Sequence, residues 1–345
     1  MVMILRNDSS WLFRCVAAWA LLQLMSASAQ SQPQECAASI VVTVFDEQGM
    51  HVNGLKAGDF RVKVDGKDVK VTSAAEEGKK RRAVVLLDTN PGMRSDKTGK
   101  WTLAREIATH VLQTGPWETP RFAIFGDLKK KAGQQTSVSS IDEVRNYDFN
   151  TIAAGIALAS PAVHPSPLFD AIYDGYSLFE TPQAGDVIFL VTDGGDAGSK
   201  KNYKEVQEAL LAAGVRLYAI TLPMRYDAEL VVTGPGSSSD ALQQRENTDF
   251  LNMVVNSGGS FLRINPNRRT NEWGFKFTDE ERMRMATSLQ LLYLQAARVY
   301  RVNATLPAPA GAARSKRLEI SLTSPANKKL QLRHPRYVSA CGPLN

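Results

Sequence analysis

Short apolar runs alternate with helical patterns over residues 83–300, and this alternation leaves few possible folds. Apolar runs that predict strands lie at 83–88, 121–128, 186–192, 215–222 and 260–264. Segments with apolar residues spaced about 3.6 apart predict helices at 101–113, 167–180, 201–213, 240–256 and 278–299. Strands that alternate with helices form mostly parallel sheets covered on both faces. We therefore expect a doubly wound α/β fold here.

Strand patterns without helices lie on both sides of this region. Residues 39–71 alternate β-branched and polar residues, and Asp65-Gly66 predicts a hairpin turn. Strand patterns return after about residue 298. We expect one β-rich domain formed by both termini, with an N-terminal β segment at 36–76 and a C-terminal one at 298–341. The α/β domain, at 80–297, would be inserted between them.

Two polar stretches are expected to lie outside the regular elements. The charged stretch "AAEEGKKRR", 74–82, shows no periodicity and predicts a linker. The stretch 129–150 predicts a surface loop with short regular pieces.

The first residues have the pattern of an export signal. Arg6 and Arg14 accompany the apolar run "CVAAWALLQLMSA", and Ala27-Ser28-Ala29 fits a cleavage site. We expect a signal peptide at 1–29 and a mature protein that is secreted or periplasmic. The apolar run is too short to span a bilayer comfortably, so we expect no stable membrane insertion.

Two cysteines remain once that segment is removed. Cys36 and Cys341 lie near the two ends of the mature chain. In an oxidising compartment an even pair predicts a disulfide, and two unpaired thiols are the alternative.

Composition and charge narrow the class of partner. The chain has 345 residues, which suits two domains, and it is 43% hydrophobic and 22% charged, as globular proteins are. The net charge of +6 arises from 41 basic and 35 acidic residues. Such a mild excess favours solubility and suits an acidic partner, but it does not indicate nucleic acid.

Two apolar runs end in an aspartate followed by turn residues. "AVVLLDTNPGM" places Asp88 after the first run, and "DVIFLVTDGGD" places Asp193 after another. Ligands of doubly wound sheets bind beyond the carboxyl ends of the strands, where both carboxylates are expected. The alternative is structural, because Asp88, Asp193 and Asp196 can each cap a turn or helix.

The order of three motifs resembles a von Willebrand factor type A domain. These are Asp88 after its strand, Ser166 before a helix in "HPSPLFDAI", and Asp193 in "LVTDGGD". The segment "VFDEQGMHVNGLKAGDFRVKVDG" is similar to the leader of secreted bacterial VWFA-related proteins, and the resemblance covers nearly all of residues 39–340. It implies a metal-ion-dependent adhesion site, in which oxygen ligands hold Mg²⁺ and a partner's carboxylate completes the coordination.

The resemblance implies a degenerate site. Asp88, Ser166 and Asp193 match family ligands, whereas Asn90 and Gly92 stand where the family has serines. Asn90 offers an amide oxygen and Gly92 offers no side chain. We expect either weak binding of Mg²⁺ or Mn²⁺ by Asp88, Asn90, Ser166 and Asp193, or a retained turn that has lost its metal.

The sequence therefore predicts an exported, non-enzymatic module for protein–protein interaction or adhesion. It would bind a protein partner, through an acidic group of that partner, at the tips of the parallel strands. The alternative is a hydrolase that uses Asp88, Asp193 and His164, although the spacing reveals no nucleophile–base pair. Gly92 and Gly99-Lys100 do not predict a phosphate loop, because six residues separate the glycines and Trp101 replaces Ser or Thr.

Overall fold

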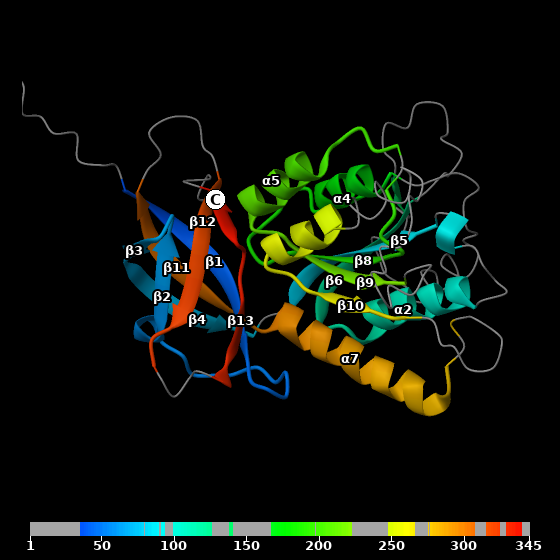
Figure 1. Cartoon of the computed structure of the whole chain (residues 1–345), viewed down its shortest axis with the longest axis horizontal. Coiled ribbons are helices and arrows are strands. Elements are labelled where there is room, and N and C mark those ends of the chain that lie inside the picture. Colours follow the sequence, from blue (N-terminus) through cyan, green and yellow to red (C-terminus); the bar gives the residue numbers. More distant parts are fainter. Residues whose placement is uncertain are drawn as a thin grey trace, which may run out of the picture.

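The structure is a computed structural model, and an α/β unit and a β unit lie side by side in it (Figure 1). The described residues are 35–78, 80–89, 91–93, 99–125, 138–140, 167–196, 198–222, 248–265, 275, 277–307, 315–324 and 329–339.

A six-stranded sheet forms the centre of the α/β unit. Its strands are β5 (Arg81–Asp88), β6 (Trp117–Phe125), β7 (Val138–Ser140), β8 (Val187–Thr192), β9 (Arg216–Thr221) and β10 (Phe261–Arg263). Their spatial order is β10-β9-β8-β5-β6-β7, and every neighbouring pair is parallel except β6 and β7. This order is that of a doubly wound sheet, so the predicted fold class is confirmed.

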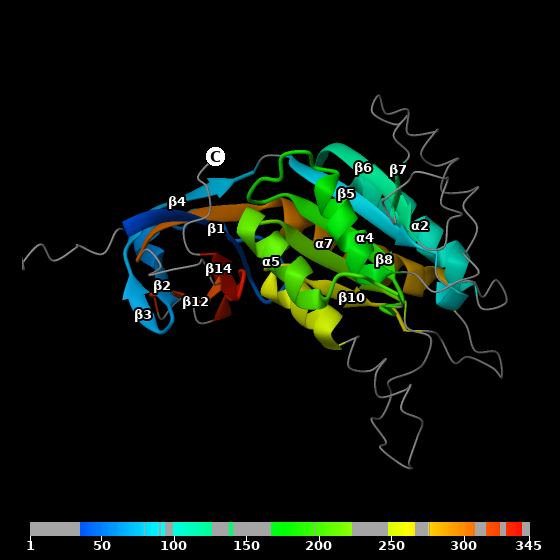
Figure 2. The same cartoon turned by 90° about the horizontal axis from the view of Figure 1, so that it is seen from above.

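Helices cover both faces of this sheet (Figure 2). On one face, α2 (Lys100–Thr114) and α7 (Asp279–Ala297) pack against Val85 and Leu87. On the other, α4 (Leu168–Ser177), α5 (Tyr203–Ala213) and the helical residues 248–256 pack against Val84 and Leu86. Successive strand residues face opposite sides, so an unbroken apolar run such as 83–87 fills both cores. None of the described helices is long and apolar enough to cross a membrane.

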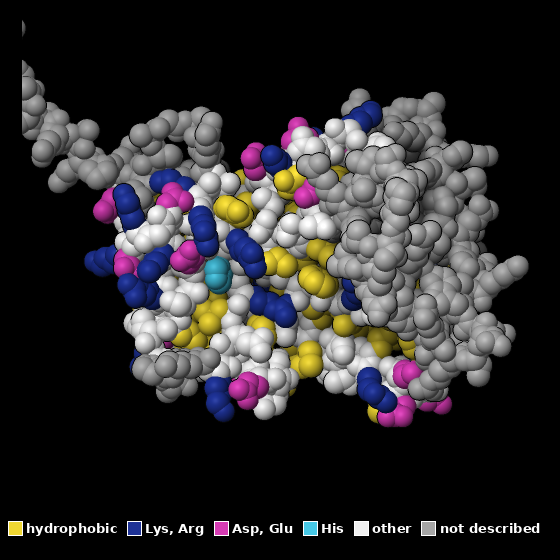
Figure 3. Space-filling view, viewed as in Figure 1, with side chains coloured by type: hydrophobic (Ala, Val, Ile, Leu, Met, Phe, Trp, Pro, Cys, Tyr) yellow, Lys and Arg dark blue, Asp and Glu magenta, His cyan; other side chains and the backbone are white. Residues whose placement is uncertain are grey.

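The β unit consists of two four-stranded sheets around an apolar core. One sheet has the order β13-β1-β11-β4 and the other β14-β12-β2-β3. The strands are β1 (Glu35–Phe45), β2 (Phe60–Val64), β3 (Lys67–Val69), β4 (Val71–Glu77), β11 (Val299–Pro307), β12 (Ser315–Leu322), β13 (Gln331–Arg333) and β14 (Tyr337–Ser339). On the face shown in Figure 3, its basic and acidic side chains are interspersed.

Strands from the two ends of the chain pair directly in this unit. β1 is antiparallel to β11, and β2 is antiparallel to β12. The chain passes from β4 into β5 and returns from α7 into β11. The domain limits 36–76, 80–297 and 298–341 remain a prediction.

One sequence-based prediction needs correction. Most of the predicted linker 74–82 is strand, because β4 extends to Glu77 and β5 begins at Arg81. β4 pairs with β11 on one side only and lies at the edge of its sheet, where charged side chains reach water. The stretch 129–150, predicted as a surface loop with short regular pieces, contains one such piece, the short antiparallel edge strand β7. The hairpin at Asp65-Gly66 is confirmed, since both residues have the positive φ of a type I′ turn between β2 and β3.

The two units are joined where α7 ends. The hydroxyl of Thr43, on β1, donates to the carbonyl of Gln295 at 3.0 Å. Arg216 donates to the carbonyl of Ala296 at 2.5 Å, and Arg81 donates to that of Ala297 at 3.3 Å. Side chains of both units thus satisfy the last carbonyls of this helix, which have no partner within it.

Candidate functional site at the strand tips

Asp88 and Asp193 lie at the carboxyl ends of two neighbouring strands. β5 ends at Asp88, β8 ends at Thr192, and the pairing of Leu87 with Val191 sets Asp88 beside Thr192. The sheet order reverses between these two strands, and doubly wound folds bind their ligands at this point. We call this the strand-tip edge. The strands begin beside the β unit, so the edge lies at the far end of the sheet from it (Figure 1).

Thr192 fixes the Asp88 carboxylate. Its hydroxyl donates to Asp88 Oδ2 at 2.5 Å and accepts from the backbone N–H of Gly194 at 3.0 Å. Both side chains are fully buried. The backbone N–H and the hydroxyl of Thr89 both donate to the carbonyl of Phe125, at 2.9 and 2.8 Å. The end of β5 is therefore held from both neighbouring strands.

Asp193 lies beside a buried lysine. Its Oδ1 accepts from the backbone N–H of Gly195 at 3.1 Å, and its Oδ2 lies 3.5 Å from Lys100 Nζ. The same Nζ donates to the carbonyl of Gly92 at 2.9 Å. Lys100 is the first residue of α2 and is only 1% exposed. Burial lowers the pKa of Lys100, and the carboxylates of Asp193 and Asp88 oppose this without cancelling it.

Asp196 caps a helix. Its Oδ1 accepts from the backbone N–H of Phe169 at 3.2 Å and from the hydroxyl of Ser199 at 2.5 Å. Phe169 is in the first turn of α4, whose free N–H groups need acceptors. Burial raises the pKa of Asp196 despite these bonds. For this residue the structural interpretation is the correct one.

The remaining predicted site residues cannot be placed. Asn90, His164, Ser166 and Cys341 lie outside the described residues. The metal set of Asp88, Asn90, Ser166 and Asp193 and the Cys36–Cys341 bond therefore stay predictions. No group of three or more His, Cys, Asp and Glu suited to a metal occurs among the residues that the structure describes.

The described part of the site disfavours a divalent cation on Asp193 Oδ2. Mg²⁺ lies about 2.1 Å from its oxygen ligands. An ion held by Asp193 Oδ2 would thus lie within about 6 Å of the Lys100 ammonium, which contacts the same oxygen. Repulsion between these two cations would cost about 6 kcal/mol at an effective dielectric constant of 20. The lysine already supplies positive charge where the resemblance implies a metal.

Lys100 and Thr192 are the contacts that the sequence analysis missed. Thr192 directly precedes Asp193, and a hydroxyl next to a strand-end aspartate is a readable signal. The sequence signal for Lys100 was weaker, because a lysine at the start of a helix usually points into water.

No protein-family model matches this chain, and no curated protein sequence does. Among solved structures, it is similar to proximal thread matrix protein 1 from the mussel byssus, at 12% identity and a TM-score of 0.40, over 68% of this chain and 49% of that one. It is also similar to the von Willebrand factor type A protein from Catenulispora acidiphila, at 10% identity and a TM-score of 0.39, over 90% of this chain and 74% of that one. The manganese-loaded TRAP protein of Plasmodium vivax matches at 12% identity and a TM-score of 0.35, over 76% of this chain and 95% of that one. This chain thus spans about half the length of the mussel protein.

Proposed function

We propose that this chain is an exported, non-enzymatic module that binds a protein partner at the strand-tip edge. The observation that carries the proposal is the convergence of Asp88, Thr192 and Asp193 at the reversal of strand order between β5 and β8. The described strands of the β unit lie beside the opposite end of the sheet (Figure 1). The β unit then acts as a scaffold.

The proposed partner presents an acidic group. α2 and α5 follow β5 and β8, so their N-terminal ends lie towards this edge. Helix N-termini carry partial positive charge and free N–H groups, which favour carboxylates. Export, with removal of residues 1–29, belongs to the proposal and rests on the pattern of charged, apolar and small residues at the N-terminus.

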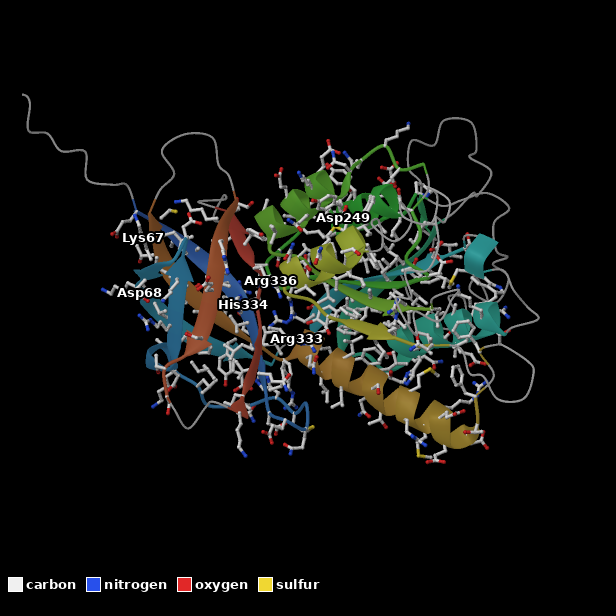
Figure 4. The ribbon with its side chains drawn as sticks, in the orientation of Figure 1. Lys67, Asp68, Asp249, Arg333, His334 and Arg336 are labelled. Carbon is white, nitrogen blue, oxygen red and sulfur yellow. The ribbon has the colours of Figure 1, made fainter. Side chains whose placement is uncertain are left out.

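A binding experiment from the native cell envelope tests this function. The tagged mature protein is used to capture partners, and the Asp193→Asn variant is compared with Asp68→Asn. Asp68 lies on β3 in the β unit, as Figure 4 shows, so this control makes the same charge change away from the strand tips. We expect the capture of a specific partner to change with Asp193→Asn and to stay the same with Asp68→Asn. A partner that both variants capture as the wild type does would place the binding surface elsewhere.

The hydrolase alternative is tested on the same proteins. Ester, peptide and phosphate substrates are offered to the wild type and to Asp193→Asn. We expect no turnover above the uncatalysed rate. Robust turnover that Asp193→Asn abolishes would instead favour an enzyme.

A further inference from the structure

Lys100 occupies a position that is unfavourable for a cation. Its side chain is 1% exposed, and burial of a charge costs free energy unless the charge is paired. It is also the first residue of α2, where the helix dipole disfavours positive charge. A long polar side chain at this place would normally extend into water. Here it points inward, so its surroundings must compensate for both costs.

The compensation comes from the groups that the strand-tip edge gathers. Lys100 Nζ donates to the carbonyl of Gly92 at 2.9 Å and lies 3.5 Å from Asp193 Oδ2. It also lies 5.9 Å from the centre of the Phe275 ring, within the range of a cation–π contact. The electrostatic attraction of Asp88 reaches it as well. Lys100 therefore lies beside Asp193 and within electrostatic reach of Asp88.

We propose that the Lys100 ammonium is the resident cation of the strand-tip edge and replaces a divalent metal there. The loss of side-chain oxygen at Gly92 fits this role, because the backbone carbonyl of Gly92 is a ligand of the ammonium instead. A tethered ammonium neutralises part of the charge of Asp88 and Asp193 without needing six regular ligands. Lys100 would have this role whether or not a protein partner binds at the strand-tip edge.

The first experiment compares Mn²⁺ binding in the wild type and in Lys100→Met. Methionine removes the charge and keeps a flexible apolar chain. In wild-type protein, millimolar Mn²⁺ should leave the melting temperature as it is in chelator. Lys100→Met should melt at lower temperature in chelator, and Mn²⁺ should raise its melting temperature by several degrees, because an ion that binds only the folded state stabilises it. The matched control is Lys67→Met on β3, an exposed lysine of the β unit, which should respond as the wild type does.

A second substitution links any effect to this site. Adding Asp193→Asn to Lys100→Met should abolish the stabilisation by Mn²⁺. Two results would overturn the inference. One is that wild-type protein binds Mn²⁺ and that the Asp193→Asn substitution abolishes this binding. The other is a folded Lys100→Met variant whose melting temperature does not respond to Mn²⁺, since the lysine would then not occupy the place of a metal.

A measurement on the wild type decides the case if Lys100→Met does not fold. Lysine labelled with ¹³C at Cε is incorporated, and the Lys100 signal is followed while Mn²⁺ is added. A paramagnetic ion at Asp193 would broaden that signal selectively, and such broadening would overturn the inference. An unchanged Lys100 signal, at Mn²⁺ concentrations that broaden surface lysines, would support it.

Discussion

At the scale of single residues, Thr192 couples the two aspartates of the strand-tip edge. Its hydroxyl donates to Asp88, while its backbone joins β8 to Asp193. It also accepts from the backbone N–H of Gly194, in the segment that follows β8. One hydroxyl thus orders the carboxylate of one strand and the loop of the next.

We expect Thr192→Val to destabilise the fold by about 1–3 kcal/mol, because it keeps the shape of the side chain but leaves buried polar groups without this partner. Urea unfolding measures the change in the free energy of unfolding. Thr192→Ser keeps the hydroxyl and should cost clearly less. Equal losses in the two variants would mean that the methyl group, and not the hydrogen bonds, matters.

The predictability of the site also differs from residue to residue. The strand-end positions of Asp88 and Asp193 follow from apolar runs with an abrupt polar end, so they were predicted. The inward position of Lys100 was not predicted. The spacing of apolar residues does not indicate that a side chain folds back over the turn before its helix. Such contacts depend on the path of the chain between β5 and α2, which local propensity does not determine.

At the scale of elements, β4 shows why one boundary was misread. It is an edge strand in which only three of seven residues are partly buried, and its sequence resembles a charged linker. The central strands are buried on both faces and are unmistakably apolar. The spacing of apolar residues reflects which side chains are buried. It therefore identifies core strands well and edge strands poorly.

Glu77 at the end of β4 holds two arginines. It pairs with Arg81 at 2.9 Å and with Arg301 at 2.5 Å. Burial alone would raise the pKa of Glu77, but hydrogen bonds and charges from the two arginines outweigh it and leave the pKa below the ordinary value of 4.5. The corner where β4, β5 and β11 meet thus depends on an ionised carboxylate.

This arrangement predicts a pH dependence of stability. A lowered folded-state pKa means that the unfolded state binds more protons in acid, so the contribution of Glu77 is present above the unfolded pKa and is lost as the pH falls through the folded one. We expect Glu77→Gln to lower the free energy of unfolding at pH 7 by about 1–2 kcal/mol. The difference from the wild type should shrink as the pH falls below about 4.5, the ordinary value for this group.

The matched control for Glu77 is Glu280→Gln. Glu280 pairs with Arg284 on the surface of α7, with 77% of its side chain exposed. Exposed ion pairs contribute little, so this variant should unfold nearly as the wild type does at every pH. A constant difference between Glu77→Gln and wild type across the pH range would refute the role of its charge.

At the scale of the whole molecule, strands from the two terminal parts of the chain are neighbours. Cys36 on β1 is paired in register with Leu306 on β11. The predicted bond from Cys36 to Cys341 would close a loop that contains nearly the entire mature chain. In the chain-entropy model such a bond stabilises by up to about 5 kcal/mol, before any strain is subtracted.

We expect thiol titration of the unfolded, unreduced mature protein to find no free cysteine. Reduction should lower the melting temperature, and a protein with both cysteines changed to serine should melt at the reduced value with or without reductant. Two reactive thiols in the unreduced mature protein would exclude the bond.

The chain enters and leaves the α/β unit at the same corner, and this has a mechanical consequence. Glu77, before β5, lies opposite Val299, after α7, on the neighbouring antiparallel strands β4 and β11. A pull applied at the strand tips therefore draws both strands in the same direction. The two strands would thus be loaded together. The load on β11 would also act against β1, whose residues from Glu35 to Val42 are paired with it. Tension applied at the strand tips would therefore pass into the β unit through β4 and β11.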